Sequence, residues 1–235
     1  MNLKNKIVCL TAFSIAMGYL ESAVVVYLRE IYYPLGFAFP IAPMTGRMAS
    51  TEVIREAATI IMLIAVGWLA GERPRYKFAW FIYCFAVWDI FYYVFLKVLT
   101  NWPESFLTWD ILFLIPVTWT GPVLAPLIVS ATLILLAFIM LSSDGDRSLW
   151  TAGRMPVILL FSGFLLIFVS LIWDFCSFMF AHFSVAALFH VPEVREAMNT
   201  YIPSGFNWLL FVAGELVVLA GIYKMYAAGK KKSLS

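Results

Sequence analysis

Residues 122–141 read PVLAPLIVSATLILLAFIML, and none of these side chains carries a charge. A helix of about 20 mostly apolar residues is long enough to cross the hydrocarbon core of a bilayer. The whole chain has the same character, because 63% of its 235 residues are apolar and only 13% are charged. Soluble domains are about half apolar and a quarter charged. The sequence therefore predicts an integral membrane protein whose main partner is the lipid bilayer.

Five further segments are long and apolar enough to span a membrane, so the predicted fold is an all-α polytopic bundle of six transmembrane helices. The predicted spans are 7–28, 52–70, 78–99, 122–141, 155–180 and 206–225. No low-complexity linker divides the chain. We therefore expect a single integral membrane domain over 1–235.

A seventh apolar stretch, 103–115, is too short to span. Pro103 suits the first position of a helix, and Pro116 would end that helix about a dozen residues later. A helix of this length extends only about 20 Å. We predict a short re-entrant or interfacial helix here, leading into the fourth span. Another short helix is predicted at the surface over 192–201.

Lysine and arginine residues divide unequally between the two sets of connections. Cytoplasmic loops carry an excess of these residues. One side holds Lys4, Lys6, Arg73, Arg75, Lys77, Arg147, Arg154, Lys224, Lys230, Lys231 and Lys232. The other side holds Arg29, Arg47, Arg55, Lys97 and Arg195. This division predicts a plasma (inner) membrane protein with both termini in the cytoplasm.

Ionisable side chains inside the predicted spans concentrate in the halves away from the cytoplasm. A charged group in a bilayer costs about 2.5 kcal/mol or more, so such groups pair, contact water or have a function. The candidate residues of a polar cavity for a substrate or ion are Glu21, Arg55, Glu56, Asp89, Tyr93, Lys97, Asp110, Asp174 and Glu215. Glu52 is left out of this set, because an acid at a helix start stabilises the helix dipole by itself.

Helical spacing indicates which way these side chains face. Asp89, Tyr93 and Lys97 are four residues apart and share one face of the third span. Such a polar face must point into the bundle, because lipid offers it no partner. Some of the charges would then form ion pairs between helices. In the purely structural alternative, Arg55 pairs with Glu21 or Asp89 and Lys97 pairs with Glu56, and these pairs only fasten the helices together.

Acids outnumber bases in this set, so some carboxyl groups should be protonated, bind a cation or touch water. Three functions remain open on these observations. Transport of a small solute, cation or proton is slightly favoured. The second is a membrane-embedded enzyme acting on a lipid or isoprenoid, with Asp89, Glu56 and Asp110 as acid–base groups and Lys97 or Arg55 holding a phosphate. The third is a non-catalytic subunit of a larger membrane complex.

Cofactors and other ligands are poorly defined by the sequence. Carboxylates could hold Mg²⁺ or Mn²⁺, but the three cysteines form no metal-binding pair. The chain contains no P-loop, G-x-S-x-G, H-E-x-x-H or G-x-G-x-x-G motif. A net charge of only +2, without a basic stripe, argues against a nucleic-acid partner.

Overall fold

The structure is a computed structural model that describes residues 2–142, 154–184 and 190–233. It consists of seven helices and a two-stranded antiparallel hairpin within these ranges. The helices are α1 (Leu3–Tyr32), α2 (Gly46–Ala70), α3 (Pro74–Thr100), α4 (Leu124–Ser142), α6 (Met155–His182), α7 (Val191–Met198) and α8 (Trp208–Ser233). The strands are β1 (Trp109–Phe113) and β2 (Trp119–Pro122).

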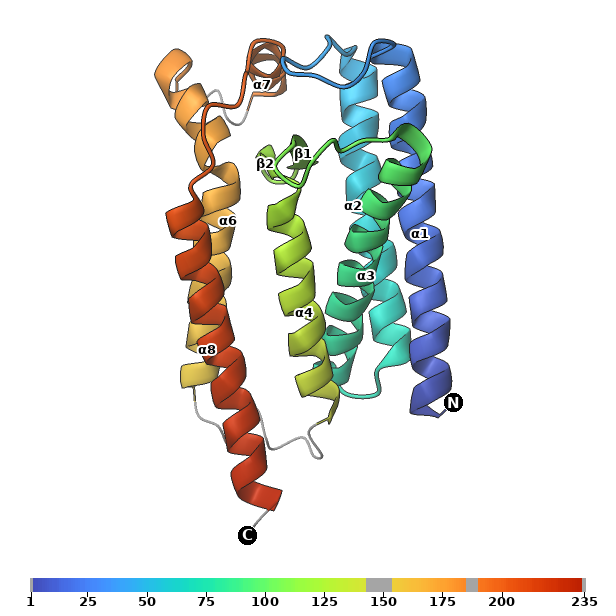
Figure 1. Cartoon of the computed structure of the whole chain (residues 1–235), viewed down its shortest axis with the longest axis vertical. Coiled ribbons are helices and arrows are strands. Elements are labelled where there is room, and N and C mark those ends of the chain that lie inside the picture. The colour runs from blue at the N-terminus through green and yellow to red at the C-terminus, as the bar shows by residue number, and fades with distance from the viewer. Residues whose placement is uncertain (1, 143–153, 185–189, 234–235) are drawn as a thin grey trace.

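The prediction of six spanning helices is confirmed, because α1, α2, α3, α4, α6 and α8 are each long and apolar enough to cross a membrane. Both chain termini lie at the same end of the bundle (Figure 1). We call this the terminal end and the opposite one the hairpin end. The connection 143–153, which holds Arg147 of the charge count, lies outside the described residues. The cytoplasmic placement of the termini stays a prediction.

The prediction of a helix over 103–115 is wrong, because this region forms a β-hairpin instead. Trp109 pairs with Pro122 and Ile111 with Thr120 across the two strands. Beyond the strands, the Val123 N–H donates to the Thr108 carbonyl at 3.0 Å. Short apolar runs do not distinguish a helix from a strand by periodicity. The two strands pair the backbone groups that face each other, and their outer edges lie toward the surrounding helices and the cavity.

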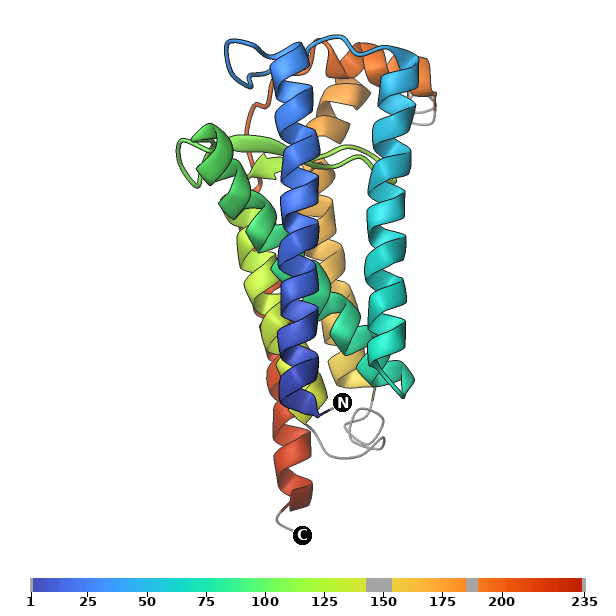
Figure 2. The ribbon, with the colours of Figure 1, turned by 90° about the vertical axis from the view of Figure 1, so that its right-hand side faces the viewer.

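The long helices pack in two groups. α3 contacts α1, α2 and α4, whereas α6 packs mainly on α8. Figure 2 shows α3 crossing behind α1 and α2, which stand apart from each other. Small side chains allow the close crossings. On α1, Ser14, Gly18 and Ser22 are buried, and a Cβ on Gly18 would lie 3.0 Å from the Trp88 carbonyl oxygen of α3.

The hairpin lies inside the bundle, below the loops of the hairpin end (Figure 1). Its strand β2 contacts α4 and α6. α4 has 19 residues, whereas α1 has 30, so α4 is about 16 Å shorter at 1.5 Å per residue. The hairpin fills the space above the short helix. The predicted surface helix over 192–201 is confirmed as α7, which covers this end.

The α6–α8 contact gives a direct test of the packing. A Cβ on Gly163 would lie 2.6 Å from Val218 Cγ2 and 2.8 Å from the Gly214 carbonyl oxygen. We expect Gly163→Ala to lower the free energy of unfolding by about 1–3 kcal/mol, because the core there is already filled. The measurement is reversible unfolding in mixed detergent micelles, followed by circular dichroism.

Gly205→Ala is the matched control, because no atom lies within 4 Å of a Cβ added there. Its unfolding free energy should stay within about 0.5 kcal/mol of the parent chain. Equal losses in the two variants would contradict the close α6–α8 packing.

Candidate functional site

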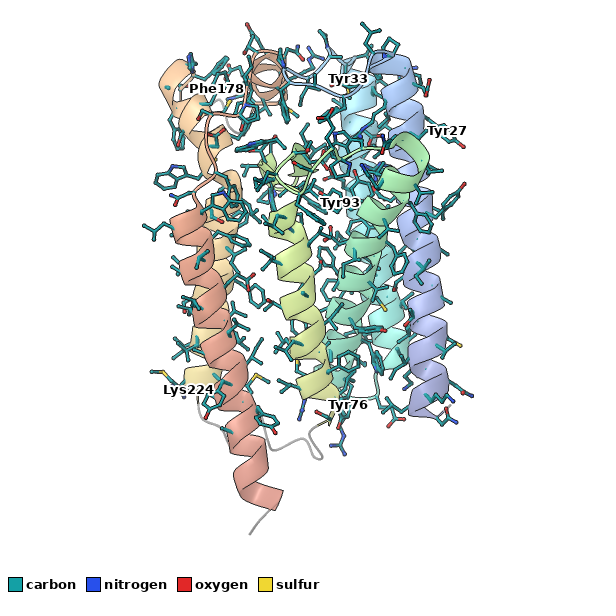
Figure 3. All side chains as sticks on the ribbon, in the orientation of Figure 1. Tyr27, Tyr33, Tyr76, Tyr93, Phe178 and Lys224 are labelled. Atoms are coloured by element: carbon teal, nitrogen blue, oxygen red, sulfur yellow. The ribbon has the colours of Figure 1, made fainter. Side chains whose placement is uncertain are left out.

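A cavity of about 620 Å³ occupies the hairpin end. Residues of α1, α2, α3, α6, α7, the hairpin and the loop between α1 and α2 line it. Figure 3 shows two of these residues, Tyr33 near the top of the bundle and Tyr93 at the level of the hairpin. Most of the wall is apolar, for example Val25, Leu28 and Ile41. Several charged side chains of the wall form two groups, one between α1 and α2 and one between α1 and β1.

The first charged group joins α1 to α2. Arg55 on α2 forms an ion pair with Glu21 on α1, and its Nε donates to Glu52 Oε2 at 2.9 Å. Thr59 Oγ1 donates to the second carboxylate oxygen of Glu21 at 3.3 Å. The predicted pair of Arg55 with Glu21 is therefore present. Glu52, excluded by the sequence argument, belongs to the same group and is buried.

The second charged group joins α1 to β1. Arg29 Nη2 lies 3.8 Å from Asp110 Oδ1, and Tyr93 OH donates to Asp110 Oδ2 at 3.2 Å. The Arg29 guanidinium also lies 3.8 Å from the Trp102 ring centroid and 4.6 Å from that of Phe37. Burial raises the pKa of Asp110 to about 6, against the lowering effect of Arg29 and Tyr93.

Two further carboxyl groups of the cavity have only one hydrogen-bond donor each among the described residues. Glu56 Oε2 accepts from the Leu114 backbone N–H at 2.9 Å. Asp89 Oδ2 accepts from Ser130 Oγ at 2.8 Å. One oxygen of each group, Glu56 Oε1 and Asp89 Oδ1, receives no hydrogen bond from the part of the chain that the structure describes. These two oxygens are available to a ligand.

Three predicted site residues lie outside the cavity. Lys97 is exposed and donates to the carbonyl oxygens of Asn101 (3.1 Å) and Pro103 (2.9 Å), so it caps α3 and does not pair with Glu56. Asp174 accepts from Tyr201 OH at 2.6 Å and from Ser204 and Gly205, which anchors the segment after α7.

Glu215 is the third predicted residue away from the cavity. Its Oε2 accepts from Thr132 Oγ1 of α4 at 2.8 Å. Its Oε1 is buried and has no hydrogen-bond partner within the described ranges. This contact joins α8 to α4 and adds nothing to the cavity wall.

Besides Glu52, the cavity lining includes Arg29 and Tyr92, which the sequence did not single out. Arg29 was counted only as a loop charge, although it lies eight residues after Glu21 on the same face of α1. That spacing could have revealed it. Tyr92 was passed over in favour of its neighbour Tyr93, yet both line the cavity. Tyr92 lies among the charges of both groups, and no sequence signal separates it from Tyr93.

No cluster of three or more His, Cys, Asp or Glu side chains suited to a metal ion occurs among residues 2–142, 154–184 and 190–233. Comparison of the chain with protein-family models, with curated proteins and with solved structures finds no match. Function must therefore be argued from the cavity itself.

The ion pairs of Arg55 generate a stability prediction. Arg55→Gln would leave Glu21 and Glu52, whose side chains are 12% and 10% exposed, without their cation. Removing one partner of a buried pair costs about 3–5 kcal/mol, and we expect a loss in this range in the free energy of unfolding. Exposed Arg47 forms no ion pair among the described residues, so Arg47→Gln is the control. Similar stabilities of the two variants would contradict the assignment.

Proposed function

We propose that this multi-pass membrane protein is an enzyme that takes an amphiphilic, lipid-type molecule into the cavity and acts on its polar head by acid–base chemistry. The observation that carries the proposal is a cavity of about 620 Å³, separated by packed side chains of α2 and α3 from the smaller cavity described at the terminal end. Cavities of this size accommodate molecules of several hundred daltons. Apolar walls suit a hydrocarbon tail, and the carboxyl groups suit a polar head.

Packed side chains lie between the cavity and the terminal end of the bundle. Leu63, Ala79 and Cys84 have no exposed surface, and they lie nearer the terminal end than the cavity residues of the same helices. A second cavity of about 220 Å³ lies at the terminal end and shares no lining residue with the first. Such an arrangement favours a binding pocket over a continuous route.

Glu56 is our candidate for the acid–base group. It is buried, it lines the cavity, and its Oε2 is held by the Leu114 N–H. That contact fixes the side chain and leaves Oε1 for a substrate proton. A positioned carboxyl group of this kind typically contributes a factor of about 10² to 10⁴ to a reaction rate. Asp89 would assist from α3.

Transport, the function that the sequence slightly favoured, fits the excess of acids equally well. It requires a route or a second conformation that opens at the terminal end, and the packed layer between the two cavities counts against a route in this conformation. A purely structural subunit would need ion pairs but no cavity of this size. The enzyme proposal uses both the cavity and the free carboxylate oxygen.

A comparison of lipid extracts tests the proposal. Cells lacking the protein should accumulate an amphiphilic species that the parent chain removes. We expect Glu56→Gln to lower this removal about a hundredfold while reaching the membrane at the parent level. Glu30→Gln, at an exposed position of α1, should act like the parent. Identical extracts with and without the protein would contradict an enzymatic role.

A further inference from the structure

The cations of the cavity are already engaged, which limits the head groups it can accept. Arg55 is held by two carboxylates. Arg29 is paired with Asp110 and lies against two aromatic rings. Lys97, a candidate phosphate ligand from the sequence, is exposed and caps α3. None of these three is free to bind a phosphate in the depth of the cavity.

Arg195 of α7 is the remaining cation of the cavity lining. Its guanidinium lies beside Gly46 at the first residue of α2, because a Cβ there would be 2.9 Å from Nη1. Glu56 is ten residues further along the same helix, which corresponds to about 15 Å. Arg195 therefore lies at the mouth of the cavity and cannot neutralise a head group bound near Glu56.

Carboxyl groups are in excess below the mouth. Five of them line the cavity, against the two guanidinium groups of Arg29 and Arg55. The five are Glu21, Glu52, Glu56, Asp89 and Asp110. An anionic head would be repelled here, and a cationic head would be attracted, with little screening in such a buried site.

Two carboxylate oxygens of the cavity lining receive no hydrogen bond from the described residues, Glu56 Oε1 on α2 and Asp89 Oδ1 on α3. An ammonium group has three N–H donors and no acceptor. Either oxygen can therefore accept a hydrogen bond from such a head group.

We propose that the cavity binds an amphiphile whose head is a protonated amine, held by the carboxylate of Glu56. The proposal rests on the function proposed above and specifies its substrate class. The hydrocarbon part lies against Val25, Leu28 and Ile41. A phosphorylated lipid or isoprenoid is excluded from this position by the excess of carboxyl groups.

Three probes with one chain length test the assignment: decylamine, 1-decanol and decyl phosphate. The full chain in lipid nanodiscs is titrated with each probe, and binding is followed by tryptophan fluorescence, since Trp88 lines the cavity. We expect decylamine to bind at least about tenfold more tightly than 1-decanol, and decyl phosphate to bind most weakly. This ranking needs no variant and does not depend on the folding of one.

Two variants test whether the carboxylate of Glu56 binds the charged head group. Glu56→Gln should weaken decylamine binding about tenfold or more and leave 1-decanol binding unchanged, because only the charged head loses an ionic partner. Glu30→Gln, at an exposed position of α1, is the control and should bind decylamine like the parent chain.

Each outcome bears on one proposal. Tighter binding of decyl phosphate or 1-decanol than of decylamine would overturn the amine assignment and leave an amphiphile pocket in place. Binding of none of the three probes would overturn the pocket as well. Selective decylamine binding together with unchanged lipid extracts would support the head-group assignment and contradict the enzymatic role.

Discussion

The ion pair between Arg55 and Glu21 is the contact on which the cavity depends. α1 and α2 each pack against α3 and make little direct contact with each other. Two helices that stand apart in this way leave a space between them, and in lipid that space would collapse or fill. Arg55 spans it by binding Glu21 on α1 and Glu52 on its own helix. The charged bridge therefore fixes the separation of the two helices and provides the polar surface of the cavity.

The hairpin supplies the second constraint. Its backbone donates to a cavity carboxylate through the Leu114 N–H, and its Asp110 receives Arg29 and Tyr93. Strand β2 contacts α4 and α6, so the hairpin joins the α1–α2–α3 group to the α6–α8 pair. Irregular backbone at membrane depth is tolerated only when protein surrounds it. Here β2 is largely buried, β1 is partly buried apart from the fully buried Asp110, and the hairpin lines one side of the cavity.

The six spans could be predicted from the sequence because length and apolar composition alone define a spanning helix. The short stretch 103–115 could not, because its apolar run fits either a helix or a strand and the choice depends on the partner strand after Pro116. Likewise, Lys97 shares a helical face with Asp89, but a lysine near a helix end can reach the last carbonyl oxygens, which the spacing argument ignores. In both cases contacts between residues distant in the sequence, or beyond the helix end, determine the structure, and helical spacing does not include them.

Six of the nine predicted site residues line the cavity and three do not, and the rule that buried charges turn toward other polar groups explains part of this division. Glu21, Arg55, Glu56, Asp89, Tyr93 and Asp110 come together in one cavity, because a buried charge in lipid must turn toward other polar groups. Asp174 and Glu215 obey the same rule with local partners, Tyr201 and Thr132. The rule identifies buried polar residues but does not say which of them share one cavity. That distinction required the arrangement of the helices.

Accessibility of single cysteines from the two sides of the membrane tests the central claim, a cavity that opens only at the hairpin end. The background is a chain whose Cys9, Cys84 and Cys176 are replaced by alanine. Val25→Cys and Ala49→Cys place a thiol on the cavity wall, and Glu72→Cys places one at the terminal end. A charged, membrane-impermeant thiol reagent should label the first two only from the side opposite to the one that labels the third. Labelling of Val25→Cys from the side that labels Glu72→Cys would contradict the account.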